Sequence, residues 1–238
     1  YKYNFYKKKF KKTKKDINLI VVKNQIIAAD NLGYVYSINI EENKLDSLIN
    51  KVKDKAFSGI NITLPFKQKI VPFLEEIIND AKITGSVNTV YLNDKGKIIG
   101  ENTDVFGLQA AYLKEVDDIS NKKTLVIGAG GVSPSVILSL QKSGIKNVSI
   151  TNRTHEKCIF LKKKFSNINI INWSNLKDEI KNFDIIINAT SLGLKDGDDF
   201  NFEFEQHKKN LIYIDTIYNP LETKTLKFLK DKEIKVFN

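Results

Sequence analysis

A lysine at position 67 follows an apolar, strand-like run and the rigid pair Pro65-Phe66, in the stretch GINITLPFKQ. An ammonium at a strand end that faces a cleft can donate a proton or stabilise negative charge developing on an oxygen. The same lysine can instead belong to the polar first turn of a helix. The chain holds 38 basic residues, and Arg153 is the only arginine among them. Most of its lysines are therefore solvated charges, and the rest of the sequence must decide the role of Lys67.

A glycine-rich run, Gly-Ala-Gly-Gly at residues 128–131, lies between an apolar strand-like segment and a segment with helical spacing. A dinucleotide-binding turn requires this context. Gly128 permits a tight turn, and Gly130 lets the backbone approach a pyrophosphate. We expect the helix start to offer unpaired N–H groups and a positive dipole end to the phosphates. Ser133 replaces the third glycine of the pattern, and Pro134 suits a first helical turn. A turn without a ligand is the alternative.

The strand that follows this helix indicates which dinucleotide would fit. It ends in Thr151-Asn152-Arg153-Thr154. NAD-binding proteins usually carry Asp or Glu at this strand end, where the carboxylate accepts a hydrogen bond from the ribose 2′-OH. Here no carboxylate stands at the strand end, and a guanidinium fork binds a 2′-phosphate well. The sequence therefore favours NADP over NAD, and an exposed arginine at a helix start is the alternative.

Apolar strands alternate with helical segments through the second half of the chain. The expected strands lie within residues 123–131, 146–154, 167–172, 182–193, 210–220 and 233–238, and the expected helices within residues 133–144, 154–165 and 223–232. Continuous apolar strands between helices indicate a parallel sheet that is covered on both faces. The predicted fold class is therefore α/β, with a Rossmann-type doubly wound parallel sheet.

The first half predicts a smaller α/β domain. Its pattern indicates helices at residues 43–56 and 67–82, the second with Pro72 in or near its first turns, and a strand at residues 57–65. Residues 87–104 predict a hairpin around the turn Asn93-Asp94-Lys95-Gly96. A helix at residues 104–116 then leads to the glycine-rich strand, and residues 17–39 predict short strands joined by turns at residues 23–24 and 31–33.

Composition narrows the function classes. The net charge of +10 is spread along the chain, and only residues 7–15 form a basic cluster, so we expect no nucleic-acid partner. No run of about 18 apolar residues occurs, so we expect no membrane partner. The single cysteine, Cys158, excludes an internal disulfide framework and fits a reducing cytoplasm. We expect no metal site. Since the chain has no methionine, even at position 1, we expect a processed or excised chain.

Seven motifs occur in a fixed order: GINITLPFKQ, GSVNTV, GENTDVFG, GAGGVSPSV, TNRT, NATSLG and DTIYNP. In order and spacing, residues 40–238 resemble the shikimate dehydrogenase family, although GAGG, NRT and NATS are partly shared with glutamyl-tRNA reductase. That family reduces 3-dehydroshikimate to shikimate with NADPH, on the route to chorismate and the aromatic amino acids. The resemblance implies an NADP(H)-dependent oxidoreductase of a small-molecule substrate, acting in the cytoplasm as a monomer or homodimer.

The resemblance also implies a role for each matching residue. Lys67 matches the catalytic lysine of the Asn-x-Thr-x-Pro-Phe-Lys run, and Asp104 matches its partner in Asn-Thr-Asp. Carbonyl reduction needs a hydride on carbon and a proton on oxygen; the Lys67 ammonium can supply that proton while Asp104 orients the amine. The implied substrate-binding residues are Thr63, Asn88, Asn102 and Tyr218. The implied cofactor-binding residues are Gly128, Ala129, Gly130, Gly131, Asn152, Arg153, Thr154, Thr190, Ser191 and Thr216.

Both ends of the chain depart from the family pattern. The family opens with a Gly-x-Pro strand and then His-Ser-x-Ser-Pro, whose serines hold the substrate carboxylate; this chain has no such motif. Residues 17–39 instead resemble a blade of a quinoprotein-type β-propeller. After the equivalent of residue 238 the family continues with a glycine-rich turn and a helix that carries a substrate-binding glutamine. We expect an atypical N-terminal segment at residues 1–39, an incomplete substrate-binding domain at 40–104 and an NADP-binding domain at 105–238.

Three functions remain open from the sequence. The first is an NADP-dependent shikimate dehydrogenase represented by a trimmed or chimeric chain. The second is an NADP-binding remnant that does not turn over, which the missing serine motif favours. The third is a relative that uses quinate, because the position of Arg153 concerns the cofactor and does not settle the ring substituents.

Overall fold

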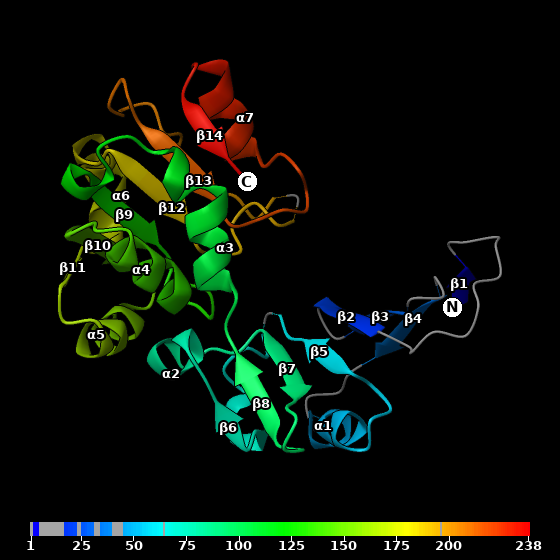
Figure 1. Cartoon of the computed structure of the whole chain (residues 1–238). Helices are drawn as coiled ribbons and strands as arrows, with labels where there is room; N and C mark the ends of the chain where they lie inside the picture. The colour runs from blue at the N-terminus through cyan, green and yellow to red at the C-terminus, as the bar shows by residue number, and fades with distance from the viewer. Residues whose placement is uncertain are drawn as a thin grey trace. The chain divides into compact units, whose positions relative to one another are not determined.

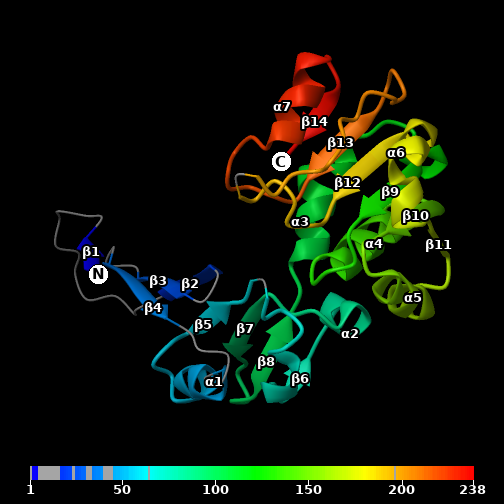
Figure 2. The ribbon, with the colours of Figure 1, turned by 180° about the vertical axis from the view of Figure 1, so that it is seen from behind.

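The computed structural model describes residues 2–4, 17–22, 25–30, 34–39, 45–63, 65–195 and 197–238, and before residue 45 it describes the backbone alone. The chain divides into two compact units, residues 1–103 and residues 104–238. Figures 1 and 2 show the elements of each unit. The two units are described separately below.

The larger unit is built on a six-stranded sheet in which every neighbouring pair of strands is parallel. Its strand order is β11-β10-β9-β12-β13-β14. The strands are β9 (Lys123–Ile127), β10 (Asn147–Thr151), β11 (Ile168–Ile170), β12 (Ile185–Asn188), β13 (Ile212–Asp215) and β14 (Lys235–Phe237). The order reverses between β9 and β12, which is the point where open α/β sheets bind ligands at the carboxyl ends of their strands.

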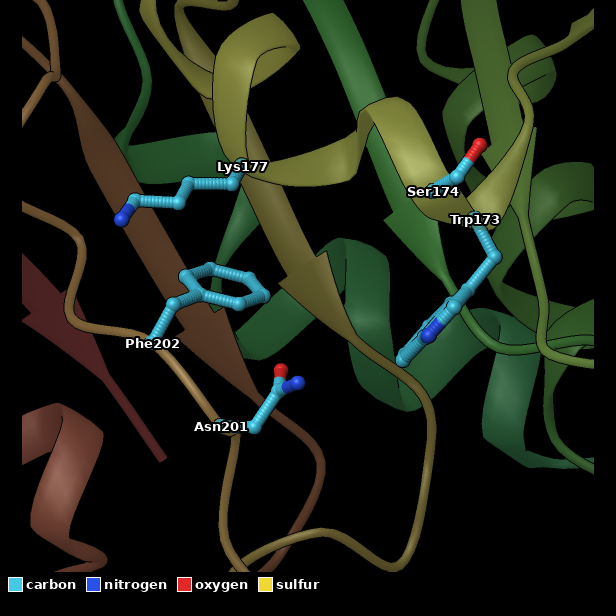
Figure 3. Close-up of a pocket in the computed structure, with 5 residues that line it drawn as sticks. All are labelled: Trp173, Ser174, Lys177, Asn201 and Phe202. Carbon is cyan, nitrogen blue, oxygen red and sulfur yellow. The ribbon is translucent and has the colours of Figure 1, made fainter.

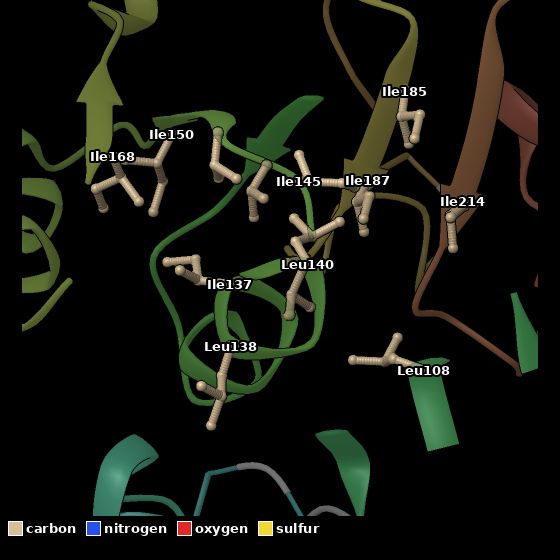
Figure 4. Close-up of a cluster of buried hydrophobic side chains, with 14 of the residues drawn as sticks. Leu108, Ile137, Leu138, Leu140, Ile145, Ile150, Ile168, Ile185, Ile187 and Ile214 are labelled. Carbon is tan, nitrogen blue, oxygen red and sulfur yellow. The ribbon is translucent and has the colours of Figure 1, made fainter. Parts of the chain in front are cut away.

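Helices and loops cover both faces of this sheet. One face packs against α3 (Asp104–Ala111), α4 (Ser133–Lys142) and α5 (His155–Lys164). In Figure 4, side chains of this cluster project from β10, β12 and α4 into the space between sheet and helices. The other face packs against α6 (Leu176–Glu179), α7 (Lys224–Asp231) and the phenylalanine-rich loop at residues 200–204. The predicted doubly wound α/β fold is confirmed.

Short 3₁₀ helices complete the larger unit. They are η3 (Leu113–Glu115), η4 (Ile119–Asn121), η5 (Trp173–Asn175) and η6 (Ile180–Asn182). Alternation along β12 shows why the strands are apolar throughout: Ile185 and Ile187 enter one core cluster and Ile186 enters the other. A strand buried on both faces has no solvent side on which polar residues would be favourable.

The smaller unit contains a four-stranded sheet in the order β5-β7-β8-β6. Its strands are β5 (Gly59–Asn61), β6 (Glu76–Ile77), β7 (Thr89–Leu92) and β8 (Ile98–Glu101), and its helices are α1 (Leu45–Lys53), α2 (Asp80–Thr84) and the 3₁₀ helix η2 (Val71–Phe73). The predicted hairpin is confirmed, since β7 pairs antiparallel with β8. The α1 helix packs its apolar face into the core of this unit.

The predicted helix at residues 67–82 is wrong. The chain forms turns at residues 65–70, η2, strand β6 and then the short helix α2. Pro72 has no N–H to donate, so a continuous helix would lose a hydrogen bond at that residue. The backbone beyond it pairs with β8 instead: Glu75 N donates to Ile98 O at 3.1 Å and Ile78 N donates to Gly100 O at 2.9 Å. Strand pairing has therefore overridden the helical spacing of the apolar residues.

A separate antiparallel sheet precedes α1, in the order β1-β4-β3-β2. It consists of β1 (Lys2–Asn4), β2 (Ile17–Val22), β3 (Gln25–Asp30) and β4 (Tyr34–Asn39). The strands expected within residues 17–39 are present as β2, β3 and β4, paired antiparallel in sequence order. The predicted turns at residues 23–24 and 31–33, and the basic cluster at residues 7–15, lie outside the described residues.

A pair of glycine substitutions tests the packing of the larger unit. Gly128 has φ +114°, and a β-carbon there would lie 2.7 Å from the carbonyl oxygen of Ala189. We expect Gly128→Ala to lower the free energy of unfolding by about 2–4 kcal/mol, because both backbone strain and the clash oppose it. Gly107 lies in the interior of α3 with nothing within 4 Å of an added β-carbon. Gly107→Ala should raise the free energy of unfolding by about 0.5–1 kcal/mol. Thermal and urea unfolding would contradict this packing if both variants shifted in the same direction.

Candidate active site

The glycine-rich turn joins β9 to α4 at the point where the strand order reverses. Gly128 N donates to Thr151 O at 2.7 Å, which ties the start of the turn to the end of β10. Added β-carbons at Gly130 and Gly131 would meet nothing closer than 3.9 Å. The turn therefore packs tightly against β12 on one side and leaves open space beside its later glycines, as a phosphate-binding loop requires.

Internal hydrogen bonds fix the shape of this turn. Ala129 N donates to Asn152 Oδ1 at 3.1 Å, and Gly130 N donates to Ser133 Oγ at 3.0 Å. At the start of α4, Ser133 N donates to Gly130 O and Ser135 N donates to Val132 O. The N–H groups of Ser133 and Ser135 are therefore paired by i→i+3 bonds, so fewer donors are unpaired at the start of this helix than the sequence analysis expects. Ser133, fully buried, occupies the third-glycine position as an acceptor.

The end of β10 lies beside the turn. Asn152 links the two, because its Nδ2 donates to Thr154 O at 3.0 Å while its Oδ1 accepts from Ala129 N. Arg153 is exposed, and Thr154 is the N-cap residue of α5. The structure therefore brings three predicted cofactor residues, Ala129, Asn152 and Thr154, into one hydrogen-bonded cluster. An exposed guanidinium stands next to that cluster.

The carboxyl ends of β12 and β13 carry polar residues that contact each other. Asn188 is fully buried, and its Oδ1 accepts from Thr190 N at 3.1 Å and Thr190 Oγ1 at 2.7 Å. Thr216 Oγ1 donates to Asn188 O at 2.9 Å. Ser191 and Tyr218 are exposed in the loops that follow. Four predicted residues, Thr190, Ser191, Thr216 and Tyr218, thus lie in two adjacent loops at one edge of the sheet.

Asp215, the last residue of β13, is only 1% exposed. Burial raises its pKa from 3.8 to about 6, although hydrogen bonds from Ile217 N, Thr223 Oγ1 and Asn188 Nδ2 favour the charged form. Tyr213 is fully buried on the same strand, and burial together with the nearby charge of Asp215 raises its pKa well above the ordinary value. The buried carboxyl group of Asp215 is therefore held at the end of β13 by hydrogen bonds from three residues.

In the smaller unit, Lys67 lies in the turns that follow Thr63. Phe66 N donates to Thr63 O at 2.9 Å, and Val87 N donates to Lys67 O at 2.8 Å. Thr63 and Lys67 are both half-buried, whereas Phe66 is buried in the core of this unit. The buried phenylalanine anchors the turn, and the hydrogen bond to residue 87 fixes the backbone of Lys67 beside the start of β7.

Asn88 directly precedes β7 and Asn102 directly follows β8, next to this turn. Asn88 Nδ2 donates to Thr103 Oγ1 at 2.9 Å, and Asn88 Oδ1 accepts from Thr103 N at 3.0 Å. Asn102 is buried, and its Nδ2 donates to Ser86 O at 2.8 Å. The half-buried Asp104 follows Thr103 directly as the first residue of α3. The structure thus groups Lys67, Asn88 and Asn102 in one part of the smaller unit. Asp104 is the next residue in the sequence after Thr103, the last residue of that unit.

A cavity of about 270 Å³ lies elsewhere in the larger unit (Figure 3). Its lining residues are Trp173, Ser174, Lys177, Asn201 and Phe202, none of which the sequence motifs single out. Within the described ranges, no three His, Cys, Asp or Glu side chains group as a metal site would require. No helix of the described chain has the length and apolar character needed to cross a membrane.

Comparison with known proteins follows the division into two units. Residues 20–90 match the family model described as the shikimate dehydrogenase substrate binding domain, and residues 110–220 match the model described as shikimate / quinate 5-dehydrogenase. A shikimate dehydrogenase (NADP(+)) from Pelagibacter ubique is 44% identical over 191 residues, which are 80% of this chain and 70% of that protein. The chain belongs to the shikimate dehydrogenase family. The first match begins at residue 20, within the segment that the sequence motifs mark as atypical.

Solved structures of this family share the fold. A shikimate dehydrogenase from Aquifex aeolicus has a TM-score of 0.75 at 38% identity, over 83% of this chain and 72% of that chain. A shikimate dehydrogenase in complex with NADP⁺ also has a TM-score of 0.75, at 33% identity, over 84% of this chain and 72% of that chain. The resemblance expected from seven short motifs therefore extends to the three-dimensional structure of most of the chain.

The sequence analysis assigned no role to the polar residues Asn188 and Asp215, and it noted Ser133 only as the replacement for the third glycine. Each is buried, and each makes hydrogen bonds that hold a loop of the predicted cofactor side. A signal was present, because Asn188 and Asp215 are the polar residues that end two apolar strands. Only the register between β12 and β13 shows that the two residues face each other, and this register cannot be predicted from a single sequence.

Asp215 and Asp184 should contribute in opposite ways to the pH dependence of the free energy of unfolding. The folded-state pKa of Asp215 is raised, so its carboxyl binds a proton more tightly in the folded state, and this contribution to stability falls as the pH rises from about 4 to about 6. A shift of about two units corresponds to about 3 kcal/mol. Relative to wild type, the free energy of unfolding of Asp215→Asn should therefore rise by up to that amount between about pH 4 and pH 7.

Asp184→Asn is the matched control for this measurement. Burial raises the pKa of Asp184, but hydrogen bonds from Lys208 and Lys123 N and the neighbouring lysine charges outweigh it, so the net pKa is lowered. Its stabilising contribution is present at neutral pH and is lost as the pH falls. The free energy of unfolding of Asp184→Asn, relative to wild type, should fall with rising pH. Urea unfolding measures this free energy at each pH. If it changed with pH in the same direction in both variants, relative to wild type, the environment assigned to Asp215 would be wrong.

Proposed function

We propose that this chain catalyses the reversible NADP(H)-dependent reduction of 3-dehydroshikimate to shikimate, a step on the route to chorismate and the aromatic amino acids. The observation that carries the proposal is the match to curated shikimate dehydrogenases (NADP(+)) through both units of the chain. The positions of the motif residues support it: they lie just beyond strand ends or in the loops and turns beside them, except Asp104, which is the first residue of α3.

The residues of the larger unit fit NADP(H). The turn at residues 128–131 leaves open space beside Gly130 and Gly131, where a β-carbon meets little or nothing. No carboxylate stands at the end of β10 to repel a 2′-phosphate, and the exposed Arg153 can bind one. Thr190, Ser191 and Thr216 lie in the loops beyond β12 and β13, where we propose that they flank the nicotinamide.

The chemistry divides between the cofactor and the side chains. NADPH, when bound, supplies the hydride for the carbonyl carbon. Lys67 then donates a hydrogen bond and a proton to the carbonyl oxygen, and Asp104 orients the lysine amine and shares the proton. Thr63, Asn88, Asn102 and Tyr218 provide hydroxyl and amide groups for the hydroxyls and carboxylate of the ring.

The same family model names quinate, so a quinate-using enzyme is the second candidate. The two ring acids differ at positions that a turnover assay with each acid separates directly. A chain that binds NADP(H) without turnover is the other alternative, and it predicts cofactor affinity with neither substrate consumed. We propose further that the protein acts in the cytoplasm as a monomer or homodimer, which its single, buried Cys158 is compatible with.

Arg153→Ala tests the cofactor assignment. Loss of a charge-assisted pair with the 2′-phosphate should weaken NADPH binding by about 1.5–3 kcal/mol and leave NADH binding nearly unchanged, since NADH has no such phosphate. Fluorescence titration with both cofactors gives the two dissociation constants. Lys162→Ala removes an exposed cation on α5, the helix that follows Arg153; it is the control and should change neither. Equal losses for NADPH and NADH in Arg153→Ala would contradict the assignment.

Lys67→Ala tests the catalytic assignment. Turnover should fall by about 10²–10⁴-fold, the range of a proton-transfer group, with NADPH affinity close to wild type. Because Lys67 and Asp104 are proposed to act on one proton, the double variant with Asp104→Asn should be scarcely slower than the slower single variant. Lys95→Ala, exposed in the β7–β8 turn, is the control. Near-normal turnover by Lys67→Ala would make Lys67 an ordinary solvated charge.

A further inference from the structure

We infer that Asp215 is a positioning residue that locks the loops after β12 and β13 into the one arrangement that receives the nicotinamide half of the cofactor. The inference rests on the proposed function for the identity of that ligand. It adds a residue that none of the motif assignments uses, and it explains how two loops distant in sequence are held at one sheet edge.

The first step is the register of the two strands. Asn188 and Asp215 are directly paired residues of the parallel strands β12 and β13. Asn188 Nδ2 donates to Asp215 Oδ1 at 3.1 Å, across the ends of the strands. Ile217 N donates to the same Oδ1 at 3.0 Å, which turns the chain after β13 back over the carboxylate. One oxygen therefore holds both strand ends.

The second step runs through Asn188 to the loop after β12. The amide that donates to Asp215 also donates to Leu192 O at 3.1 Å, and its oxygen accepts from Thr190 N and Oγ1. Leu192 N in turn donates to Thr190 Oγ1 at 3.0 Å. Because Asp215 accepts from Nδ2, it fixes which way the Asn188 amide points, and so it fixes Thr190.

The third step runs through the second carboxylate oxygen to α7. Thr223 Oγ1 donates to Asp215 Oδ2 at 3.0 Å, and the same hydroxyl accepts from Leu226 N as the N-cap of the helix. The loop at residues 216–222 is thereby held at both ends by one carboxylate. Thr216 and Tyr218, two of the predicted site residues, lie in that span.

The energetics favour a positioning role over a purely stabilising one. A buried carboxylate is costly, and no cation within the described part of the chain forms an ion pair with Asp215. The titratable groups beside it, Tyr112 and Tyr213, each have a pKa raised by burial first and by its charge second. The two carboxylate oxygens accept from Asn188, Ile217 and Thr223, so what the group supplies here is the geometry of the loops.

Asp184 offers a matched comparison at the opposite edge of the same sheet. It directly precedes β12, and it accepts from Lys123 N at 2.8 Å and from Lys208 Nζ at 2.7 Å. It therefore also joins neighbouring strands through one carboxylate, but at their amino ends. Loss of Asp184 should cost stability without disturbing the loops at the carboxyl ends.

The experiment compares Asp215→Ala, Asp215→Asn, Thr223→Val and Asp184→Ala in the full chain, by NADPH titration and by hydrogen exchange. We expect Asp215→Ala to raise the dissociation constant for NADPH about tenfold or more. Asp215→Asn keeps an oxygen for Asn188 and Ile217 and should stay within about threefold of wild type, as should Thr223→Val. Asp184→Ala should leave NADPH affinity unchanged. The amides of Thr190, Leu192 and Ile217 should exchange faster in Asp215→Ala but not in Asp184→Ala.

Two results would overturn the inference. One is an equal loss of NADPH affinity in Asp215→Ala and Asp184→Ala, which would reflect stability alone. The other is unchanged exchange at the three amides in Asp215→Ala. If that variant does not fold, a loss of NADPH affinity of about tenfold or more in Asp215→Asn would overturn the inference, because asparagine keeps the accepting oxygen. A wild-type chain that binds no NADPH would instead refute the proposed function, and the exchange comparison would still decide the role of Asp215.

Discussion

Amide and carboxylate side chains at the carboxyl ends of buried parallel strands need partners inside the protein, and this constraint shapes the site. The strands β12 and β13 are buried and apolar until their last residues, where Asn188 and Asp215 meet. An unpaired amide or carboxylate at that depth would cost several kcal/mol, so each loop beyond the strands supplies a donor or acceptor. The loops that are proposed to hold the cofactor are thus fixed by the requirement to satisfy the sheet edge.

The glycine turn depends on the same edge. Gly128 approaches the carbonyl of Ala189 so closely that no side chain fits, which places the turn against the residue that follows Asn188. Asn152 then joins the turn to the end of β10. Three strand ends, from β10, β9 and β12, are therefore connected by short polar contacts. A cofactor that spans the sheet edge would meet a surface that is already ordered before it binds, which lowers the entropic cost of binding.

The sequence was sufficient for the features that depend on local pattern. Apolar runs between helical segments predicted the parallel sheet, and the strand–glycine–helix order predicted the turn at residues 128–131. Residues 67–82 were mispredicted because β6 forms by pairing with β8, a strand that comes later in the chain. Asn188 and Asp215 were missed for a similar reason, since their contact depends on register between strands 27 residues apart. Pairing between strands that are distant in the chain is the feature that is hardest to predict from a single sequence.

The smaller unit shows how a short motif acquires its geometry. Phe66 is buried and anchors the turn, and residue 87 holds the backbone of Lys67 by a hydrogen bond. Asn88 then fixes Thr103, the residue before Asp104, by two hydrogen bonds. The backbones of the proposed proton-transfer residues are thus positioned by hydrogen bonds of neighbouring residues.

The most direct test of the account is isotopic. The full chain would be incubated with 3-dehydroshikimate and NADPH that carries deuterium at the transferred position, and the product would be analysed by mass spectrometry and NMR. We expect shikimate with one deuterium on the carbon that held the ketone. The Lys67→Ala substitution should slow the formation of this labelled shikimate. Recovery of unchanged 3-dehydroshikimate, from a chain shown by titration to bind NADPH, would contradict the account and identify a cofactor-binding protein without this activity.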